Sequence, residues 1–68
     1  MGSQKELGRK IKKARLRSDL TQAEVAEKAG IHTNYFARIE RGEENPSIDI
    51  VESIAKALKV KSSDILPF

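Results

Sequence analysis

The chain has 68 residues, a formal net charge of +3 and no cysteine, so it can form one small domain without disulfides or thiolate metal sites. A domain of this size buries about 60% of its unfolded surface, which disfavours a deep catalytic cleft. No apolar run approaches the roughly 18 residues of a membrane span, and no signal peptide is visible. We therefore expect a cytoplasmic protein that is not an enzyme and has no small-molecule ligand. It needs neither cofactor nor metal, since the lone histidine, His32, cannot form a metal site by itself.

The first predicted element is a basic helix from about Gln4 to Ser18. Leu7, Ile11 and Ala14 recur at helical spacing, and lysines and arginines occupy the other faces. This concentration of positive charge suits a polyanionic partner, although a solvated helix face is the simpler alternative. Residues 1–3 resemble a cloning remnant or a disordered start, and we expect one domain over residues 4–68.

The second predicted helix begins at Thr21 and ends at Gly30. Thr21 and Glu24 have the spacing of a capping box, in which each side chain accepts a hydrogen bond from the other residue's backbone N–H. Asp19, just before this helix, is a residue that tolerates a left-handed or turn conformation. Glycine at the helix end favours a sharp change of direction.

The third predicted helix runs from about Thr33 to Arg41, with Phe36 and Ile39 on its core-facing side. Only Gly30, Ile31 and His32 separate it from the second helix. A short turn containing glycine, with an apolar residue to fill the joint, is typical of a helix-turn-helix.

The last two predicted elements follow Pro46. Ser47 is positioned to cap a fourth helix. A fifth, short helix covers about Ser62 to Leu66, with Ser62 or Ser63 as its cap. The expected core residues of the fourth helix are Ile48, Val51, Ile54, Ala55 and Leu58. Because no segment alternates with period two, the fold class is all-α, a compact bundle of five helices.

The stretches "LTQAEVAEKAGI", "RIERG", "NPSIDIVESIAKALKV" and "SSDIL" resemble the phage-repressor-like (Cro/XRE) helix-turn-helix family. The resemblance covers nearly the whole chain and places the motif at about residues 21–41. It implies a lambda-repressor-like fold and a dimeric transcriptional regulator that binds double-stranded DNA. It also implies that the third helix enters the major groove of a palindromic operator, and that the protein acts there as a repressor or an activator.

The predicted base contacts are Thr33, Asn34 and Arg38, at the start of the third helix and one turn further on. Asparagine can bind adenine N6 and N7, and arginine can bind guanine O6 and N7. Asn34 and Arg38 are four residues apart and therefore share one helix face. Residues assigned to phosphates, or to DNA without a defined role, are Thr21, Gln22, His32, Tyr35, Arg41 and Asn45.

Two departures from the family pattern bear on this site. Members of the family usually have serine or threonine where His32 stands, so we expect Thr33 to cap the third helix instead. Glu43 and Glu44 place two negative charges in the following loop, where they would weaken DNA binding unless they point away.

The resemblance also implies a structural pair between Arg15 and Glu40, which would join the first helix to the third. An exposed apolar patch of Ile50, Leu66 and Phe68 is the candidate homodimer interface, although Leu66 and Phe68 could instead close the core of the monomer. The alternative function is a protein-interaction module, such as an antitoxin or an adaptor, on the same fold.

Overall fold

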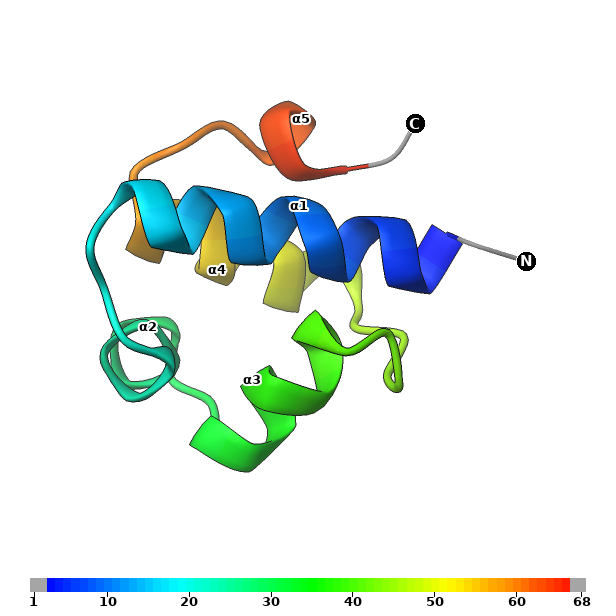
Figure 1. Cartoon of the computed structure of the whole chain (residues 1–68), viewed down its shortest axis with the longest axis horizontal. Coiled ribbons are helices and arrows are strands. Elements are labelled where there is room, and N and C mark those ends of the chain that lie inside the picture. Colours follow the sequence, from blue (N-terminus) through cyan, green and yellow to red (C-terminus); the bar gives the residue numbers. More distant parts are fainter. Residues whose placement is uncertain (1–2, 67–68) are drawn as a thin grey trace.

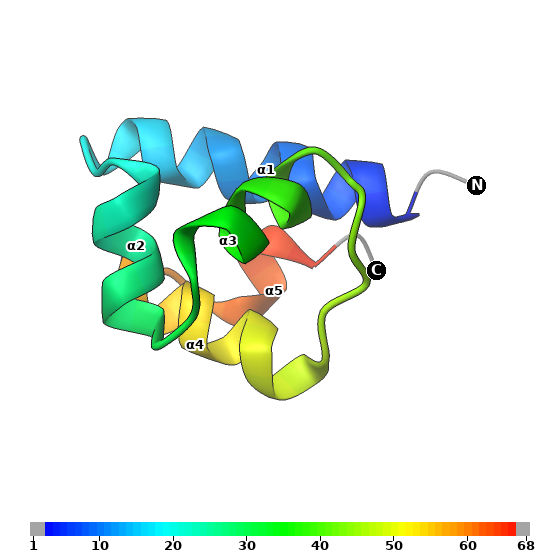
Figure 2. The same ribbon diagram turned by 90° about the horizontal axis from the view of Figure 1, so that it is seen from below.

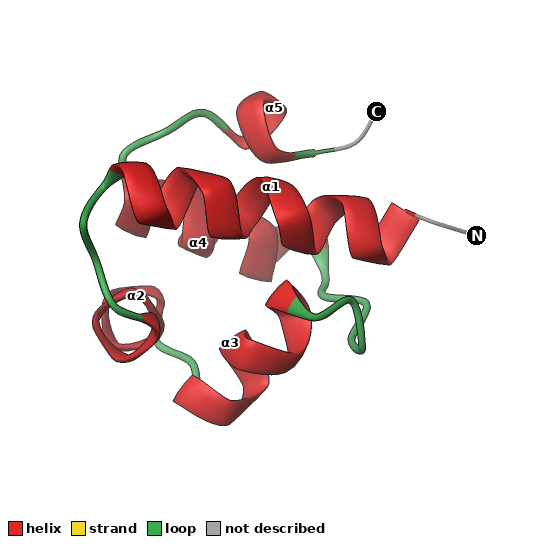
Figure 3. Cartoon of the chain, in the orientation of Figure 1, coloured by secondary structure: helices red, strands yellow, loops and turns green. Residues whose placement is uncertain are grey.

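Five helices and no strand are found in residues 3–66, which are the residues that the computed structural model describes (Figures 1 and 3). The helices are α1 (Ser3–Arg17), α2 (Gln22–Ala29), α3 (Thr33–Glu40), α4 (Ile48–Leu58) and α5 (Ser62–Ile65). The all-α prediction is therefore confirmed. α1 begins at Ser3, one residue earlier than predicted.

The ends of α2 follow the predicted chemistry. Thr21 Oγ1 accepts a hydrogen bond from the Glu24 backbone N–H at 3.1 Å, and Glu24 Oε1 accepts one from the Thr21 N–H at 2.8 Å. Gly30 ends the helix with φ +75°, in the left-handed region that glycine enters without steric cost. Asp19, in the preceding turn, also has a positive φ of 59°.

The later helices are capped in two different ways. Ser47 Oγ accepts a hydrogen bond from the Ile50 N–H at 3.2 Å, as predicted for the start of α4. The prediction that Ser62 or Ser63 caps α5 is wrong, because Lys61 occupies the N-cap position and Ser62 is already helical. The Asp64 carboxylate reaches back instead and accepts a hydrogen bond from the Lys61 N–H at 3.1 Å.

The core lies between α1, α2, α3 and α4, and α5 closes it from the other side of α1. In Figure 1, α1 crosses the molecule with α3 on one side, α5 on the other and α4 behind it. The buried apolar residues are Leu7, Ile11, Val25, Ala26, Phe36, Ile39, Val51, Ile54, Ala55, Ala57, Leu58 and Ile65. Every described helix thus contributes at least one side chain to a single core.

One residue of the expected α4 core stripe is exposed. Ile48 keeps 54% of its surface accessible, whereas Ile50, predicted to lie off the stripe, packs partly buried against the core. Ile48 is the first residue of α4, and Cα–Cβ bonds tilt toward the helix N-terminus. Its side chain is therefore directed past the start of the helix and stays largely exposed.

α1 and α3 approach each other closely at Gly8. A Cβ atom at this position would overlap the carbonyl oxygens of Ile39 and Glu40, at the end of α3. Gly8 is itself buried. The absence of a side chain therefore lets the backbones of the two helices come into direct contact, and this contact positions α3.

Candidate nucleic-acid interface

The candidate site is built on the short turn that joins α2 to α3. The Ile31 N–H donates to the Ala26 carbonyl at 2.9 Å, which ties the turn back to α2. The Ile31 side chain packs partly buried against the core, as expected for a residue that fills the joint. Figure 2 shows the result, with α2 and α3 at a steep angle and α3 facing the viewer.

α3 has one apolar edge and one polar edge. Phe36 and Ile39 have no exposed surface and anchor the helix in the core. At its start, His32, Thr33 and Asn34 are all exposed. The helix is therefore held rigidly from one side and presents polar side chains on the other.

The start of α3 carries no side-chain cap. His32 occupies the N-cap position with extended backbone, and its side chain forms no capping hydrogen bond. The expectation that Thr33 caps the helix is wrong, because Thr33 is the first helical residue and lies beyond the position from which a cap can act. Thr33 is exposed, so its hydroxyl is accessible to an outside partner.

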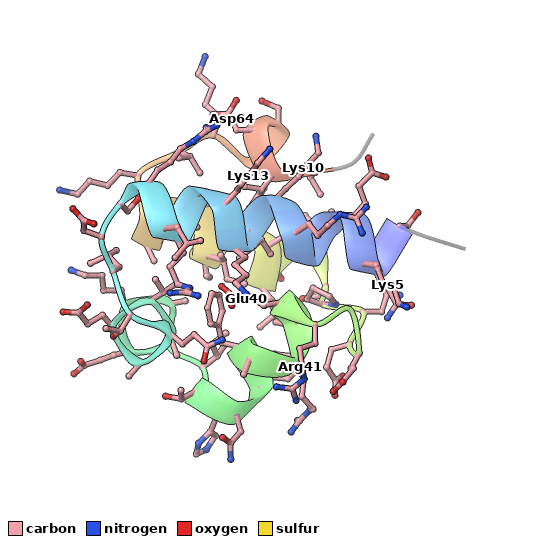
Figure 4. All side chains as sticks on the ribbon, in the orientation of Figure 1. Lys5, Lys10, Lys13, Glu40, Arg41 and Asp64 are labelled. Atoms are coloured by element: carbon pink, nitrogen blue, oxygen red, sulfur yellow. The ribbon has the colours of Figure 1, made fainter. Side chains whose placement is uncertain are left out.

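Arg15 and Glu40 form a partly buried ion pair that joins α1 to the end of α3. Arg15 Nε donates to Glu40 Oε2 at 2.7 Å, and Arg15 Nη2 donates to Glu40 Oε1 at 3.2 Å. The two side chains are only 11% and 3% exposed. Figure 4 shows Glu40 in the interior between the two helices, where it cannot contact an outside ligand.

Gln22 belongs to the same network, which sequence reasoning missed. Its Nε2 donates to Glu40 Oε1 at 2.8 Å, across a separation of 18 residues. An amide nitrogen carries two N–H donors, so one remains after this bond. Gln22 can thus still donate to a phosphate, from a side chain whose position Glu40 fixes.

The arginines of α3 and its C-cap are paired with the acidic loop that follows. Arg38 Nε donates to Glu44 Oε2 at 2.9 Å. Arg41 forms two bonds to Glu43, from Nε and Nη2, both at 3.1 Å. The two glutamates therefore do not point away from the predicted DNA-binding residues, and each lies against one of them.

The Arg41–Glu43 pair also shifts both ionisation equilibria. The hydrogen bond from Arg41 lowers the pKa of the Glu43 carboxyl below its usual range. The same hydrogen bond raises the pKa of the Arg41 guanidinium. The lowered pKa keeps the Glu43 carboxyl charged even within the pH range where an ordinary glutamate becomes protonated. The pair is therefore lost only when the pH falls through the lowered value.

The remaining predicted residues lie apart from these ion pairs, or outside residues 3–66. Asn45 is exposed in the loop, and Tyr35 is partly exposed on α3. Ile50 and Leu66 are partly buried against the core. Phe68 lies outside the described residues. Within residues 3–66, no group of acidic and histidine side chains is arranged to hold a metal ion, and no helix could cross a bilayer.

The steep α2–α3 junction and the exposed polar edge of α3 define a helix-turn-helix domain of the DNA-binding class. A family model described as helix-turn-helix (HTH_3) matches residues 11–65. The chain belongs to this family. It is a DNA-binding transcriptional regulator, from a family that is not enzymatic.

Individual relatives agree with that assignment. The chain is 40% identical over 62 residues to the control protein C.BamHI of Bacillus amyloliquefaciens, a match that covers 90% of this chain and 76% of that protein. It is 42% identical over 60 residues to the immunity repressor of Bacillus phage phi105. That match covers 88% of this chain but only 42% of the phage repressor, so the chain spans less than half of that relative's length.

Solved structures show the same architecture. The restriction-modification controller protein C.AhdI from Aeromonas hydrophila superposes with a TM-score of 0.93, covering 97% of this chain and all of that one. Its sequence is 23% identical, so this likeness concerns the fold alone. The controller protein C.Esp1396I superposes with a TM-score of 0.85 at 33% identity, covering 90% of this chain and 80% of that chain.

Proposed function

We propose that the chain binds a two-fold symmetric DNA operator as a homodimer, with α3 of each copy in the major groove. The observation that carries the proposal is the exposed, uncapped polar start of α3, opposite an edge that is fully buried. A major groove about 12 Å wide admits one helix, and the N-terminal residues of that helix reach the base edges.

The proposed base contacts are Thr33, Asn34 and Arg38. Thr33 and Asn34 are exposed in the first turn, and Arg38 lies one turn further on with 43% of its side chain exposed. Around them we assign phosphate or less specific contacts to Thr21, Gln22, His32, Tyr35, Arg41 and Asn45. Of these residues, Arg41 is the one with a permanent positive charge, and it would exchange its bonds to Glu43 for a phosphate.

Selection of bound sites from random duplex DNA tests the proposal directly. We expect a pair of inverted half-sites separated by about one helical turn, and binding whose log affinity falls linearly with log salt concentration. If no duplex binds even at low salt, the operator proposal fails. The antitoxin or adaptor function would then take its place.

Two substitutions separate base reading from backbone binding. Arg38→Ala should weaken binding to the selected site by about 1–3 kcal/mol and relax the preference at one base pair. Gln22→Ala should weaken all duplexes to a similar degree. Since Gln22 also bonds to Glu40, thermal unfolding of each variant is measured alongside the binding. An Arg38→Ala protein with full base preference would exclude Arg38 from the base contacts.

A further inference from the structure

The pairing of Arg38 with Glu44 leaves one defined part of the arginine free. A guanidinium has five N–H donors, one on Nε and two on each Nη. Glu44 accepts the Nε donor through a single oxygen at 2.9 Å. In residues 3–66, that is the one hydrogen bond that the Arg38 side chain makes to protein. The two Nη groups are thus left as a pair of parallel donors.

We propose that Glu44 is a specificity-determining residue, which holds Arg38 at Nε so that Nη1 and Nη2 meet the O6 and N7 atoms of one guanine. This inference rests on the proposed function, because it requires Arg38 to contact a base. Glu44 itself is a positioning residue and need not touch DNA.

The physical reason is the loss of conformational freedom in a long side chain. An arginine side chain that has no partner in the protein loses its conformational freedom when it binds DNA, and this loss reduces the affinity gained from its contacts. A charge-assisted bond to Glu44 restricts the conformations of Arg38 before DNA arrives. The donors then form a fixed fork, which rewards the correct base and cannot adapt to a wrong one.

The neighbouring pair provides an internal contrast. Glu43 engages Arg41 through both Nε and Nη2, so this bidentate pair occupies the edge that a phosphate would bind. Both side chains are more than half exposed. Glu43 therefore competes with DNA for Arg41, whereas Glu44 leaves the reading end of Arg38 open. Two adjacent glutamates with the same charge should have different effects on binding.

The test compares Glu44→Ala with the matched control Glu43→Ala, on a selected duplex and on a random one. Each substitution removes one negative charge and the same side chain from the loop that follows α3, where the Glu43 side chain is 52% exposed and the Glu44 side chain 34%. We expect Glu44→Ala to lower the ratio of specific to random affinity about three- to tenfold. We expect Glu43→Ala to raise both affinities by the same factor and leave the ratio unchanged.

Replacing the contacted guanine with 7-deazaguanine gives a readout that a structural role would not move. The wild type should lose affinity, because one acceptor of the fork is removed. The Glu44→Ala protein should lose less. If Glu44→Ala instead changes both affinities equally, as Glu43→Ala does, Glu44 acts only as a competing charge and the inference is overturned.

Arg38→Ala separates this inference from the proposed function. If Arg38→Ala lowers the affinity ratio and Glu44→Ala does not, the base contact stands and the positioning role fails. If neither lowers it, the base contact itself is wrong and both fail. In an Arg38→Ala background, Glu44→Ala should leave the ratio unchanged, and a further decrease would show that Glu44 acts independently of Arg38.

Discussion

At the scale of single residues, the charged side chains at the end of α3 divide between the interior and the surface. Glu40 points inward to Arg15 and Gln22, while Arg38 and Arg41 point outward to loop acids. The inward group fixes where the helix ends, and the outward group can exchange its protein partners for DNA. Three residues within one helical turn thus have separable effects on stability and on binding.

Arg15→Ala should destabilise the domain by about 3 kcal/mol or more, because it leaves the Glu40 carboxylate buried with only Gln22 as a partner. Urea unfolding followed by circular dichroism measures the loss. The matched control is Arg17→Ala, the same substitution at an exposed position of the same helix, which should change stability by less than about 0.5 kcal/mol. Equal effects of the two substitutions would mean that the ion pair contributes nothing particular.

At the scale of elements, the direction of α3 depends on two contacts that involve no functional side chain. One is the turn at Gly30, whose positive φ redirects the chain. The other is Gly8, where α1 lies directly against the last carbonyl groups of α3. A change at either contact should move the reading edge without altering any residue on it.

Gly8→Ala should destabilise the fold, although alanine favours helix by about 1 kcal/mol over glycine. The added methyl group would overlap backbone oxygens of Ile39 and Glu40, which cannot move aside as a flexible side chain can. We expect a net loss of about 1–3 kcal/mol and weaker DNA binding, measured by thermal unfolding and by titration of a selected duplex. A gain in stability would show that α1 and α3 are able to separate at no cost.

The C-terminal end of α4 offers a prediction of the opposite sign. Lys59 ends the helix with φ 58° and ψ 41°, a left-handed conformation that is strained for a residue with a side chain. Lys59→Gly should therefore stabilise the domain by about 0.5–1 kcal/mol, relief of strain outweighing the added freedom of the unfolded chain. Lys56→Gly, at an exposed position inside the same helix, should destabilise it by about 1 kcal/mol, and the same sign for both would refute the argument.

Local signals predicted the helices, because capping residues and glycines act on their immediate neighbours. The capping box at Thr21 and the turn at Gly30 are of this kind, and both are present. Sequence reasoning did not identify the partners of Glu43 and Glu44, since the chain leaves the helix at Glu40 and no periodic spacing relates a loop residue to a helix residue. It misplaced Ile48 for a related reason, because helical spacing predicts a face but not where the covering elements end.

At the scale of the whole molecule, the position of α4 suits a two-fold dimer on DNA. Figure 2 looks onto α3, with α4 along one side of the molecule and α5 behind it. An interface through the start of α4 would leave both copies of α3 facing the same side. An interface on the opposite face of the molecule from α3 would direct the two reading helices apart.

The described residues place a suitable apolar surface at that position. Ile48 is 54% exposed at the first residue of α4, whereas Ile50 packs against the core and is only partly exposed. The molecule extends 29 × 22 × 20 Å, so two copies side by side can span half-sites about 34 Å apart. We therefore expect Ile48 to lie at the interface, together with the sequence-predicted Ile50.

Sedimentation of Ile48→Glu, with and without a selected duplex, tests this interface without disturbing the core. At a two-fold contact, the introduced carboxylate would lie against the same carboxylate of the second copy. The variant should therefore sediment as a monomer. It should lose affinity for the full palindrome and keep its affinity for a half-site. Leu16→Glu is the matched control, because Leu16 is 58% exposed on α1 and should leave the mass unchanged. Ile50→Glu should behave as Ile48→Glu does, with some loss of stability from its partial burial. If both α4 variants keep the wild-type mass, the start of α4 is not the interface. A wild-type protein that binds its palindrome as a monomer would rule out the dimer altogether.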